Sequence, residues 1–163
     1  MCAVAVFVLF VGGGILFAQV PQAKKKSPMP DLEVKEINII PEPKEGAVLN
    51  SVKILVLNEG TADAAANKMQ ISCMVAGCRP GGNCEAVSSK VRGIIDVPVI
   101  KKGTIAEITW VLPSSVKWVE GKYTILAEVD KYNAVKESDE SDNIKRTLIH
   151  ASSIQVDAAE KNK

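Results

Sequence analysis

The sequence predicts an all-β protein, an antiparallel β-sandwich of about seven short strands. Turn-forming residues recur roughly every 10 residues, and the segments between them are rich in β-branched residues. Apolar and polar residues alternate in several of these segments, which indicates strands with one face on a core. No stretch of helical periodicity exceeds about 12 residues. With 163 residues, the chain has room for one such domain and little more.

The first half of the expected sandwich contains three strands. Residues 31–40 alternate and stop before Pro41, because proline cannot continue a central ladder. Residues 51–58 are largely apolar on both faces, which predicts an interior strand or a strand whose outer face is covered by another part of the protein. Asn58, Glu59 and Gly60 predict a turn. Residues 68–76 alternate again. The short segment TADAAANKM, residues 61–69, is expected to form one helical turn.

The second half begins with a loop and an irregular strand. Residues 77–90 are rich in Gly, Pro and Ser, which predicts a loop. Residues 91–100 are β-prone, but Pro98 within them predicts an edge strand or a bulged strand. Residues 104–112 form the next expected strand, which we expect Pro113 to end.

Residues 121–143 close the domain with a strand, a turn and the start of a last strand. Residues 123–129 follow a period-2 pattern, with Tyr123, Ile125, Ala127 and Val129 on one face. The next residues are rich in Asp, Asn and Ser, whose short polar side chains stabilise turns. Tyr123 stands where a tyrosine corner would have its ring, with a hydroxyl that bonds upstream backbone. An ordinary core tyrosine is the alternative.

The amino-terminal segment predicts export. Residues 1–18 contain no charged side chain, which is typical of a signal peptide or of a short membrane anchor. Cleavage near Ala18 and retention as an anchor both remain open, and only the uncleaved form would hold the protein to a membrane. Residues 19–30 have a linker composition, residues 31–150 form the domain, and residues 151–163 form a polar tail. The expected location is extracytoplasmic: periplasmic, secreted or surface-attached.

Composition and motifs argue against several classes of function. A net charge of +1 provides no field that would hold nucleic acid. The sequence has no Ser/His/Asp set, no paired-carboxylate cleft and no phosphate-binding glycine motif. We therefore expect a protein that is not an enzyme and needs no cofactor.

The cysteines predict one disulfide bond. Cys78 and Cys84 flank the flexible pentapeptide RPGGN, and an oxidising compartment favours a bridge between them. A bridge between Cys73 and Cys78 is the alternative, although Cys73 lies on an apolar strand face and is expected to be a buried thiol. A metal site formed by the three cysteines and His150 is disfavoured, because the spacing lacks the close cysteine pair of structural zinc sites.

Carboxylate and amide groups follow the strand that ends near Val129. Oxygen ligands of this kind suit calcium, yet the segment lacks the spacing of an EF-hand loop, and a solvated turn explains the same residues. Both readings stay open. The candidate calcium ligands are Asp130, Asn133, Glu137, Asp139, Glu140 and Asp142.

The closing segment also resembles the signature of the CARDB family, the cell-adhesion-related domain found in bacteria. Shorter matches lie around Pro30, in the turn Asn58 to Thr61 and from Lys102 to Trp110, so the resemblance covers about residues 30–149. The residues that resemble the closing signature are Gly121, Tyr123, Ala127, Val129, Asp130, Asn133, Val135, Glu137, Ser138, Glu140 and Asn143.

This resemblance implies an immunoglobulin-like sandwich that serves as an extracytoplasmic binding or adhesion module for a protein or cell-surface ligand. Because sandwiches present loops on a rigid frame, the cysteine-bearing loop is the expected contact surface. One alternative is a structural subunit that assembles through the sheet edge at residues 91–100, and another is a calcium-stabilised accessory domain. The expected polar contacts of the loop are Arg79, Asn83, Glu85 and Arg92.

Overall fold

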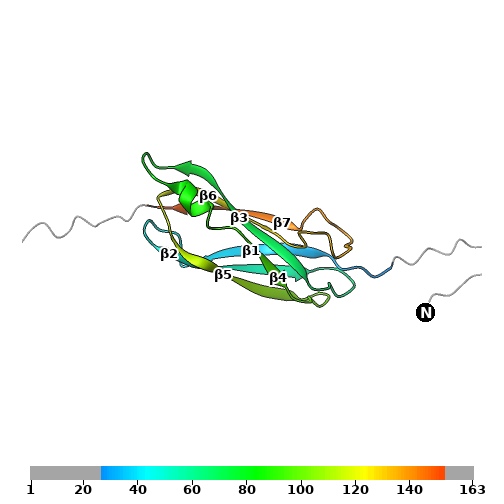
Figure 1. The fold of residues 1–163 in the computed structure, drawn as a ribbon. Coiled ribbons are helices and arrows are strands. Elements are labelled where there is room, and N and C mark those ends of the chain that lie inside the picture. Colours follow the sequence, from blue (N-terminus) through cyan, green and yellow to red (C-terminus); the bar gives the residue numbers. More distant parts are fainter. Residues whose placement is uncertain (1–26, 153–163) are drawn as a thin grey trace, which may run out of the picture.

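The computed structural model describes residues 27–152, which form seven strands and one short helix (Figure 1). The elements are β1 (Leu32–Ile40), β2 (Val48–Asn58), β3 (Asn67–Cys78), α1 (Cys84–Ser88), β4 (Gly93–Val97), β5 (Ile105–Lys117), β6 (Gly121–Glu128) and β7 (Ile144–Ala151).

The strands form two antiparallel sheets. One sheet has the order β1-β2-β5, and the other has the order β4-β3-β6-β7. The two sheets face each other as layers in Figure 1. This arrangement confirms the predicted all-β, immunoglobulin-like sandwich. It also places β2 in the middle of its sheet, as its two apolar faces predict, and β4 at an edge.

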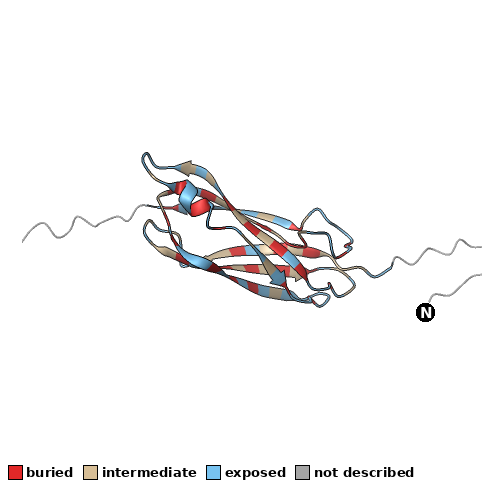
Figure 2. Cartoon of the chain, in the orientation of Figure 1, coloured by how far each residue is buried: buried red, intermediate tan, exposed pale blue. Residues whose placement is uncertain are grey.

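The hydrophobic core lies between the two layers, where Figure 2 shows the buried positions of both sheets. Strand β2 contributes Val52, Ile54 and Val56, and β6 contributes Tyr123 and Ile125. All five side chains are fully buried. Alternate residues of these strands face the core because successive strand side chains point to opposite sides of a sheet. Full burial of each such side chain stabilises the fold by about 1.5–3 kcal/mol.

A bulge in strand β1 changes which of its residues face the core. Leu32 and Val34 are buried, and the pairing register with β2 then shifts between Val34 and Glu36. The extra residue of this bulge brings Ile37 to the core in place of Glu36. The strand ends at Ile40, directly before Pro41, as predicted.

Strand β5 does not end at Pro113, and this prediction was wrong. The strand runs from Ile105 to Lys117, although its register with β2 jumps from Val111 to Val116 between Ser51 and Leu49. Pro113 therefore lies in a bulged segment of an edge strand. A missing N–H breaks no ladder hydrogen bond at such a position, so the chain continues.

Two helical expectations were also wrong. The loop at residues 77–90 contains the helix α1, and residues 61–69 contain no helical turn. In the second segment, Ala64 pairs instead with Ile100, since each backbone N–H donates to the other residue's carbonyl at 2.9 and 3.1 Å. Those bonds take the backbone groups that a helical turn would need.

The described chain enters and leaves the sandwich at opposite ends, as Figure 1 shows. It enters beside the β6–β7 connection, where Ser138 donates its N–H to the Pro30 carbonyl at 2.9 Å. It leaves beside the α1 end, where both Cys78 and Ala151 pair with Gly121. The predicted signal segment, most of the linker and nearly all of the tail lie outside the described residues. Within residues 27–152, no helix is long and apolar enough to span a membrane.

Candidate functional site

The loop after β3 is closed by a disulfide bond between Cys78 and Cys84. Their α-carbons are 5.9 Å apart, and Cys84 is buried whereas Cys78 is exposed. Bridging so short a loop stabilises the fold by about 2 kcal/mol on the chain-entropy model. The main consequence of the bond is therefore to hold the shape of the loop.

Helix α1 begins within this disulfide loop. The Asn83 side chain accepts a hydrogen bond from the Ala86 N–H at 3.2 Å and so caps the helix. The helix sits tightly on the sheet, because a β-carbon at Gly121 would lie 2.7 Å from the Gly77 carbonyl and 3.0 Å from the Cys84 sulfur. Only glycine fits at position 121 without displacing one of them.

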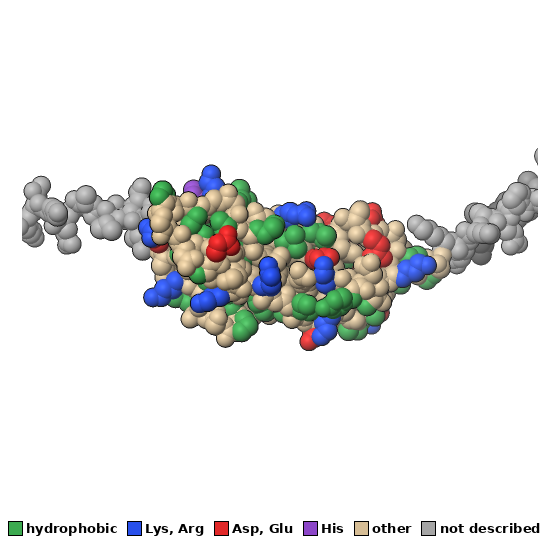
Figure 3. Space-filling view, turned by 45° about the horizontal axis from the view of Figure 1, so that its top comes forward, with side chains coloured by type: hydrophobic (Ala, Val, Ile, Leu, Met, Phe, Trp, Pro, Cys, Tyr) green, Lys and Arg blue, Asp and Glu red, His purple; other side chains and the backbone are tan. Residues whose placement is uncertain are grey.

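A cationic surface surrounds α1. Lys90, Arg92 and Lys117 are exposed, and no carboxylate of the described residues lies within 4.0 Å of their charged groups. A hollow of about 390 Å³ lies between α1 and the end of β5, with Lys90 and Lys117 among its lining residues. We call the hollow and these three residues the α1 surface. Figure 3 shows Lys and Arg side chains over this end of the visible face.

The structure separates the four predicted contact residues of the loop by role. Arg79 forms an ion pair with Glu45 at 2.8 Å, so its charge is already engaged. Asn83 caps α1 and also lines the hollow. The Glu85 carboxylate accepts a hydrogen bond from the Ser88 hydroxyl at 3.1 Å. Arg92 is exposed beyond the helix, and it is the one of the four that brings an unpaired positive charge to the α1 surface among the described residues.

Two buried aromatic residues, Trp118 and Tyr123, pack in the core at the α1 end of the sandwich. Trp118 is 1% exposed, and its ring meets that of Tyr123 edge-on, with centroids 5.0 Å apart. The Tyr123 hydroxyl donates a hydrogen bond to the Val119 carbonyl at 2.8 Å, four residues upstream. This is the bond expected of a tyrosine corner, and the ring is also fully buried.

Cys73 is a buried free thiol rather than a partner of Cys78. Burial, together with the nearby charge of Glu85, raises the pKa of the Cys73 thiol to about 12. The thiolate is the reactive form of cysteine, so this residue is chemically inert at neutral pH and packs as a small apolar side chain. His150 is exposed on β7, where it pairs in register with Lys122 of β6. Cys78 and Cys84 are bonded to each other, so their sulfurs are not available as thiolate ligands for a metal with His150.

The opposite end of the sandwich holds an acidic cluster. Carboxylate oxygens of Asp130, Glu137 and Glu140 lie within 4.8 Å of one another. Asp130 is 2% exposed and Glu137 is 5% exposed. Both oxygens of Asp130 accept backbone hydrogen bonds, from Ala134 at 2.9 Å and from Val135 at 2.8 Å. The cluster is thus built into the β6–β7 connection.

Two of the other three predicted calcium ligands, Asp139 and Asp142, are not in this cluster. Asn133 occupies a turn position with φ 49°, a conformation that asparagine tolerates better than most residues. Asp139 accepts hydrogen bonds from the N–H and the hydroxyl of Ser141, at 2.8 and 2.7 Å. The Asp142 carboxyl group has a pKa raised by burial and by the nearby Asp31 charge.

Glu137 is the most perturbed carboxyl group of the cluster. Burial raises its pKa to about 7, and the charges of Glu140 and Asp130 act in the same direction. Hydrogen bonds from the Leu32 N–H and from the Asn143 carboxamide oppose this rise. The bond from Leu32 also ties the connection to the first residue of β1.

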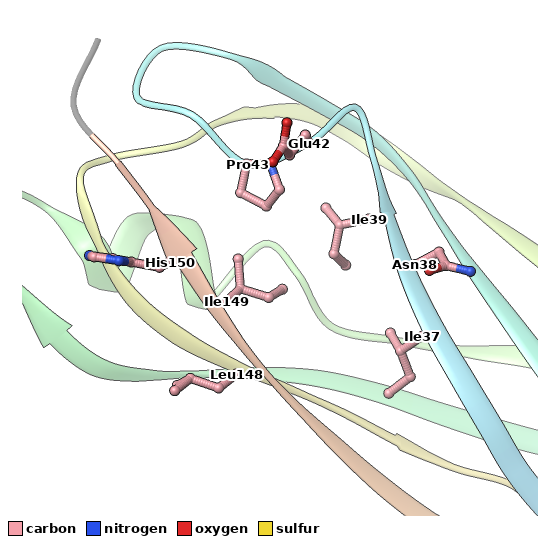
Figure 4. Close-up of a pocket in the computed structure, with 8 residues that line it drawn as sticks. All are labelled: Ile37, Asn38, Ile39, Glu42, Pro43, Leu148, Ile149 and His150. Atoms are coloured by element: carbon pink, nitrogen blue, oxygen red, sulfur yellow. The ribbon is translucent and has the colours of Figure 1, made fainter. Parts of the chain in front are cut away.

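A second hollow, of about 280 Å³, lies between β1 and β7 (Figure 4). Ile37, Ile39 and Ile149 face the space between the strands, whereas His150 extends away from it. Ile37 and Ile149 are each only 6% exposed, so they belong to the core. The polar side chains among its lining residues are those of Asn38, Glu42 and His150.

The sequence interpretation missed three residues that the structure brings to these sites. Lys90 and Lys117 reach the α1 surface from segments 27 positions apart in the printed sequence, and only the fold places them together. Asn143 reaches into the acidic cluster, where its Nδ2 lies 3.4 Å from Glu137 and 3.3 Å from Glu140. Its place directly after the acidic segment was the one available signal.

Fold and surface together define a small immunoglobulin-like β-sandwich module. The sequence profile of CARDB matches residues 29–147, which is well over half of the chain. The protein therefore belongs to the CARDB family, a family of non-catalytic modules associated with cell surfaces. No curated protein matches the chain.

Two solved structures support the same fold, and a third is similar over part of its length. The CARDB domain of a Pyrococcus furiosus protein, solved in complex with di-metal ions, is 18% identical with a TM-score of 0.57; the match covers 79% of this chain and 99% of that one. A domain of a putative cell surface protein from Methanosarcina acetivorans is 20% identical with a TM-score of 0.50, over 76% and 92% of the two chains. Part of a β-glucosidase from Erythrobacter marinus is similar at a TM-score of 0.45 and 14% identity, over 75% of this chain and 15% of that one.

Proposed function

We propose that the protein is an exported, non-catalytic binding or adhesion module that contacts a protein or cell-surface ligand through the α1 surface. The observation that carries this proposal is a disulfide-braced loop beside three cations, Lys90, Arg92 and Lys117, that have no carboxylate within 4.0 Å among the described residues. An exposed cationic surface on a rigid frame favours a partner that carries acidic groups.

The position of the α1 surface supports this proposal. The described chain begins at the end of the sandwich opposite α1 (Figure 1). If the amino-terminal segment holds the domain at a membrane, the α1 surface would face away from that membrane. The disulfide bond fits an oxidising, extracytoplasmic compartment. We infer no enzymatic activity, because the chain belongs to a family of non-catalytic modules.

Assembly through the edge of β4 is the second hypothesis. β4 pairs with β3 alone, so its outer edge is open, and Ile94 is 52% exposed beside it. The strand has only five residues and is followed by Pro98, which limits the ladder that a partner strand could form.

Charge reversal tests the proposal. We expect the double variant Lys90→Glu/Arg92→Glu to bind envelopes of the producing cells about tenfold more weakly than the wild type, because repulsion replaces attraction at the contact. The measurement is the affinity of fluorescently labelled protein for purified cell envelopes, with the wild type giving a saturable curve.

The matched control is Lys102→Glu/Lys136→Glu, which makes the same charge change at exposed positions of the opposite end. It should bind like the wild type. Equal weakening of both double variants, or envelopes that do not bind the wild type, would contradict the proposal. Loss of binding in Ile94→Lys with full binding in Lys90→Glu/Arg92→Glu would support the β4 edge instead.

A further inference from the structure

The acidic cluster contains buried carboxylates that no basic side chain of the described residues neutralises. Eight ion pairs occur in residues 27–152, and none involves Asp130, Glu137 or Glu140. Two lysines neighbour the cluster in the sequence. Lys131, next to Asp130, is paired with Glu128 at 2.8 Å, and Lys136, next to Glu137, is exposed and forms none of these eight ion pairs. Buried charges in proteins are normally paired or coordinate a metal ion, because taking a carboxylate out of water is costly.

The carboxamide of Asn143 is a second and independent observation. Asn143 is 5% exposed, and its buried Oδ1 has no hydrogen-bond partner. The side chain nevertheless points at the cluster, since its Nδ2 lies within 3.4 Å of both glutamates. Buried polar atoms without a partner are rare in proteins, and each needs a physical reason.

Rotation of the carboxamide by half a turn supplies that reason. The nitrogen and oxygen of an asparagine side chain are nearly equal in size, so rotation exchanges their positions. With Nδ2 inward, the carboxamide donates to the two glutamates, which suits the cluster without a cation. With Oδ1 inward, the same side chain becomes a ligand, and Nδ2 takes the outward position that Oδ1 holds without a cation.

We propose that Asp130, Glu137, Glu140 and Asn143 bind one calcium ion, with the carboxamide oxygen of Asn143 as the fourth protein ligand. Calcium prefers carboxylate and carbonyl oxygens and accepts irregular geometry, with water completing six to eight ligands. Magnesium requires a smaller, nearly octahedral site. The backbone bonds to Asp130 already orient its carboxylate, which keeps lone pairs for an ion.

A calcium ion here would also brace the start of the domain. The Glu137 carboxylate accepts a hydrogen bond from the Leu32 N–H, and the Ser138 hydroxyl donates to Asp31 at 2.8 Å. The site therefore joins the β6–β7 connection to the beginning of β1. This inference concerns the end opposite the α1 surface, so it stands or falls independently of the proposed function.

Calcium titration of the purified full chain tests the site. We expect 10 mM CaCl₂ to raise Tm by about 5 °C relative to EDTA at matched ionic strength, as for a module with millimolar or tighter affinity. The variant Glu140→Gln should lose most of this rise, because Glu140 is exposed and its loss leaves the fold intact. The matched control Asp139→Asn, which changes a neighbouring exposed carboxylate outside the cluster, should keep it.

The side-chain amide resonances of Asn143 provide a direct readout. In ¹⁵N-labelled protein they should shift with the same calcium midpoint as the change in Tm. An unchanged wild-type Tm would overturn the proposal. Equal rises with MgCl₂ and CaCl₂, or equal loss in Glu140→Gln and Asp139→Asn, would also overturn it, since both would show general charge screening. Stationary Asn143 resonances would exclude the carboxamide as a ligand.

Discussion

Replacing Trp118 with alanine is expected to lower the free energy of unfolding by about 3–5 kcal/mol. Trp118 is among the largest fully buried side chains, and it packs against Tyr123 between β5 and β6. Its backbone is also held, because its N–H donates to the Ala47 carbonyl at 3.0 Å. The surroundings therefore have little freedom to close the cavity that alanine would leave, which places the cost in the upper range for core substitutions.

Urea unfolding followed by circular dichroism measures this loss. The control is Tyr132→Ala, which removes an aromatic ring that is 62% exposed and should change the free energy of unfolding by less than about 0.5 kcal/mol. A loss below about 1 kcal/mol for Trp118→Ala would contradict the packing described for the α1 end.

Glu137 is expected to make the stability of the calcium-free protein depend on pH. Burial, reinforced by the Glu140 and Asp130 charges, raises its folded-state pKa to about 7, above the ordinary value of 4.5. The folded protein therefore binds a proton more tightly at this site than the unfolded chain does. The stability that protonation contributes is fully present below about pH 4.5 and is lost as pH rises through about 7.

The expected contribution of Glu137 to this change is up to about 3 kcal/mol. It is measured as the free energy of unfolding in EDTA between pH 5 and pH 8.5. The variant Glu137→Gln retains an acceptor for the Leu32 N–H and carries no charge, so its profile should be flatter than that of the wild type. Parallel profiles for the two proteins would contradict the assigned ionisation.

The strand pattern of this chain was readable from its residues because burial on a sheet follows a period of two. Val52, Ile54 and Val56 alternate with half-buried residues, and their burial follows the predicted faces. The apolar outer face of β2 also predicted its central position correctly, since a strand flanked on both sides has less exposed surface.

Predictions from local sequence were wrong where the position of a residue in the fold decides whether a strand or a helix can form. Pro113 ends an interior strand by rule, but it is tolerated in β5 because that strand is at an edge and bulged. Helix α1 has five residues, too few to show a periodic pattern. Its one signal was Asn83, a good N-cap residue three positions before Ala86.

The candidate sites were only partly predictable for the same reason. Three of the six predicted calcium ligands converge because the β6–β7 connection folds back on itself, with Asp130 at φ 45°. Sequence spacing alone does not reveal which carboxylates of a turn point inward. Likewise, Lys117 joins Lys90 at the α1 surface only because β5 ends beside α1.

The two ends of the sandwich thus have different chemistry on one rigid frame. The end where the described chain enters carries the acidic cluster, and the opposite end carries the disulfide loop and its cations. In this account the first end anchors and stabilises the domain, and the second end contacts a partner.

Hydrogen–deuterium exchange with and without cell envelopes tests the role of the α1 surface most directly. Binding through this surface predicts slower exchange of backbone amides in residues 79–92 when envelopes are present. Amides of the β6–β7 connection, at the other end, should exchange at an unchanged rate. Protection confined to β4 or to the β6–β7 connection, with residues 79–92 unaffected, would contradict the account.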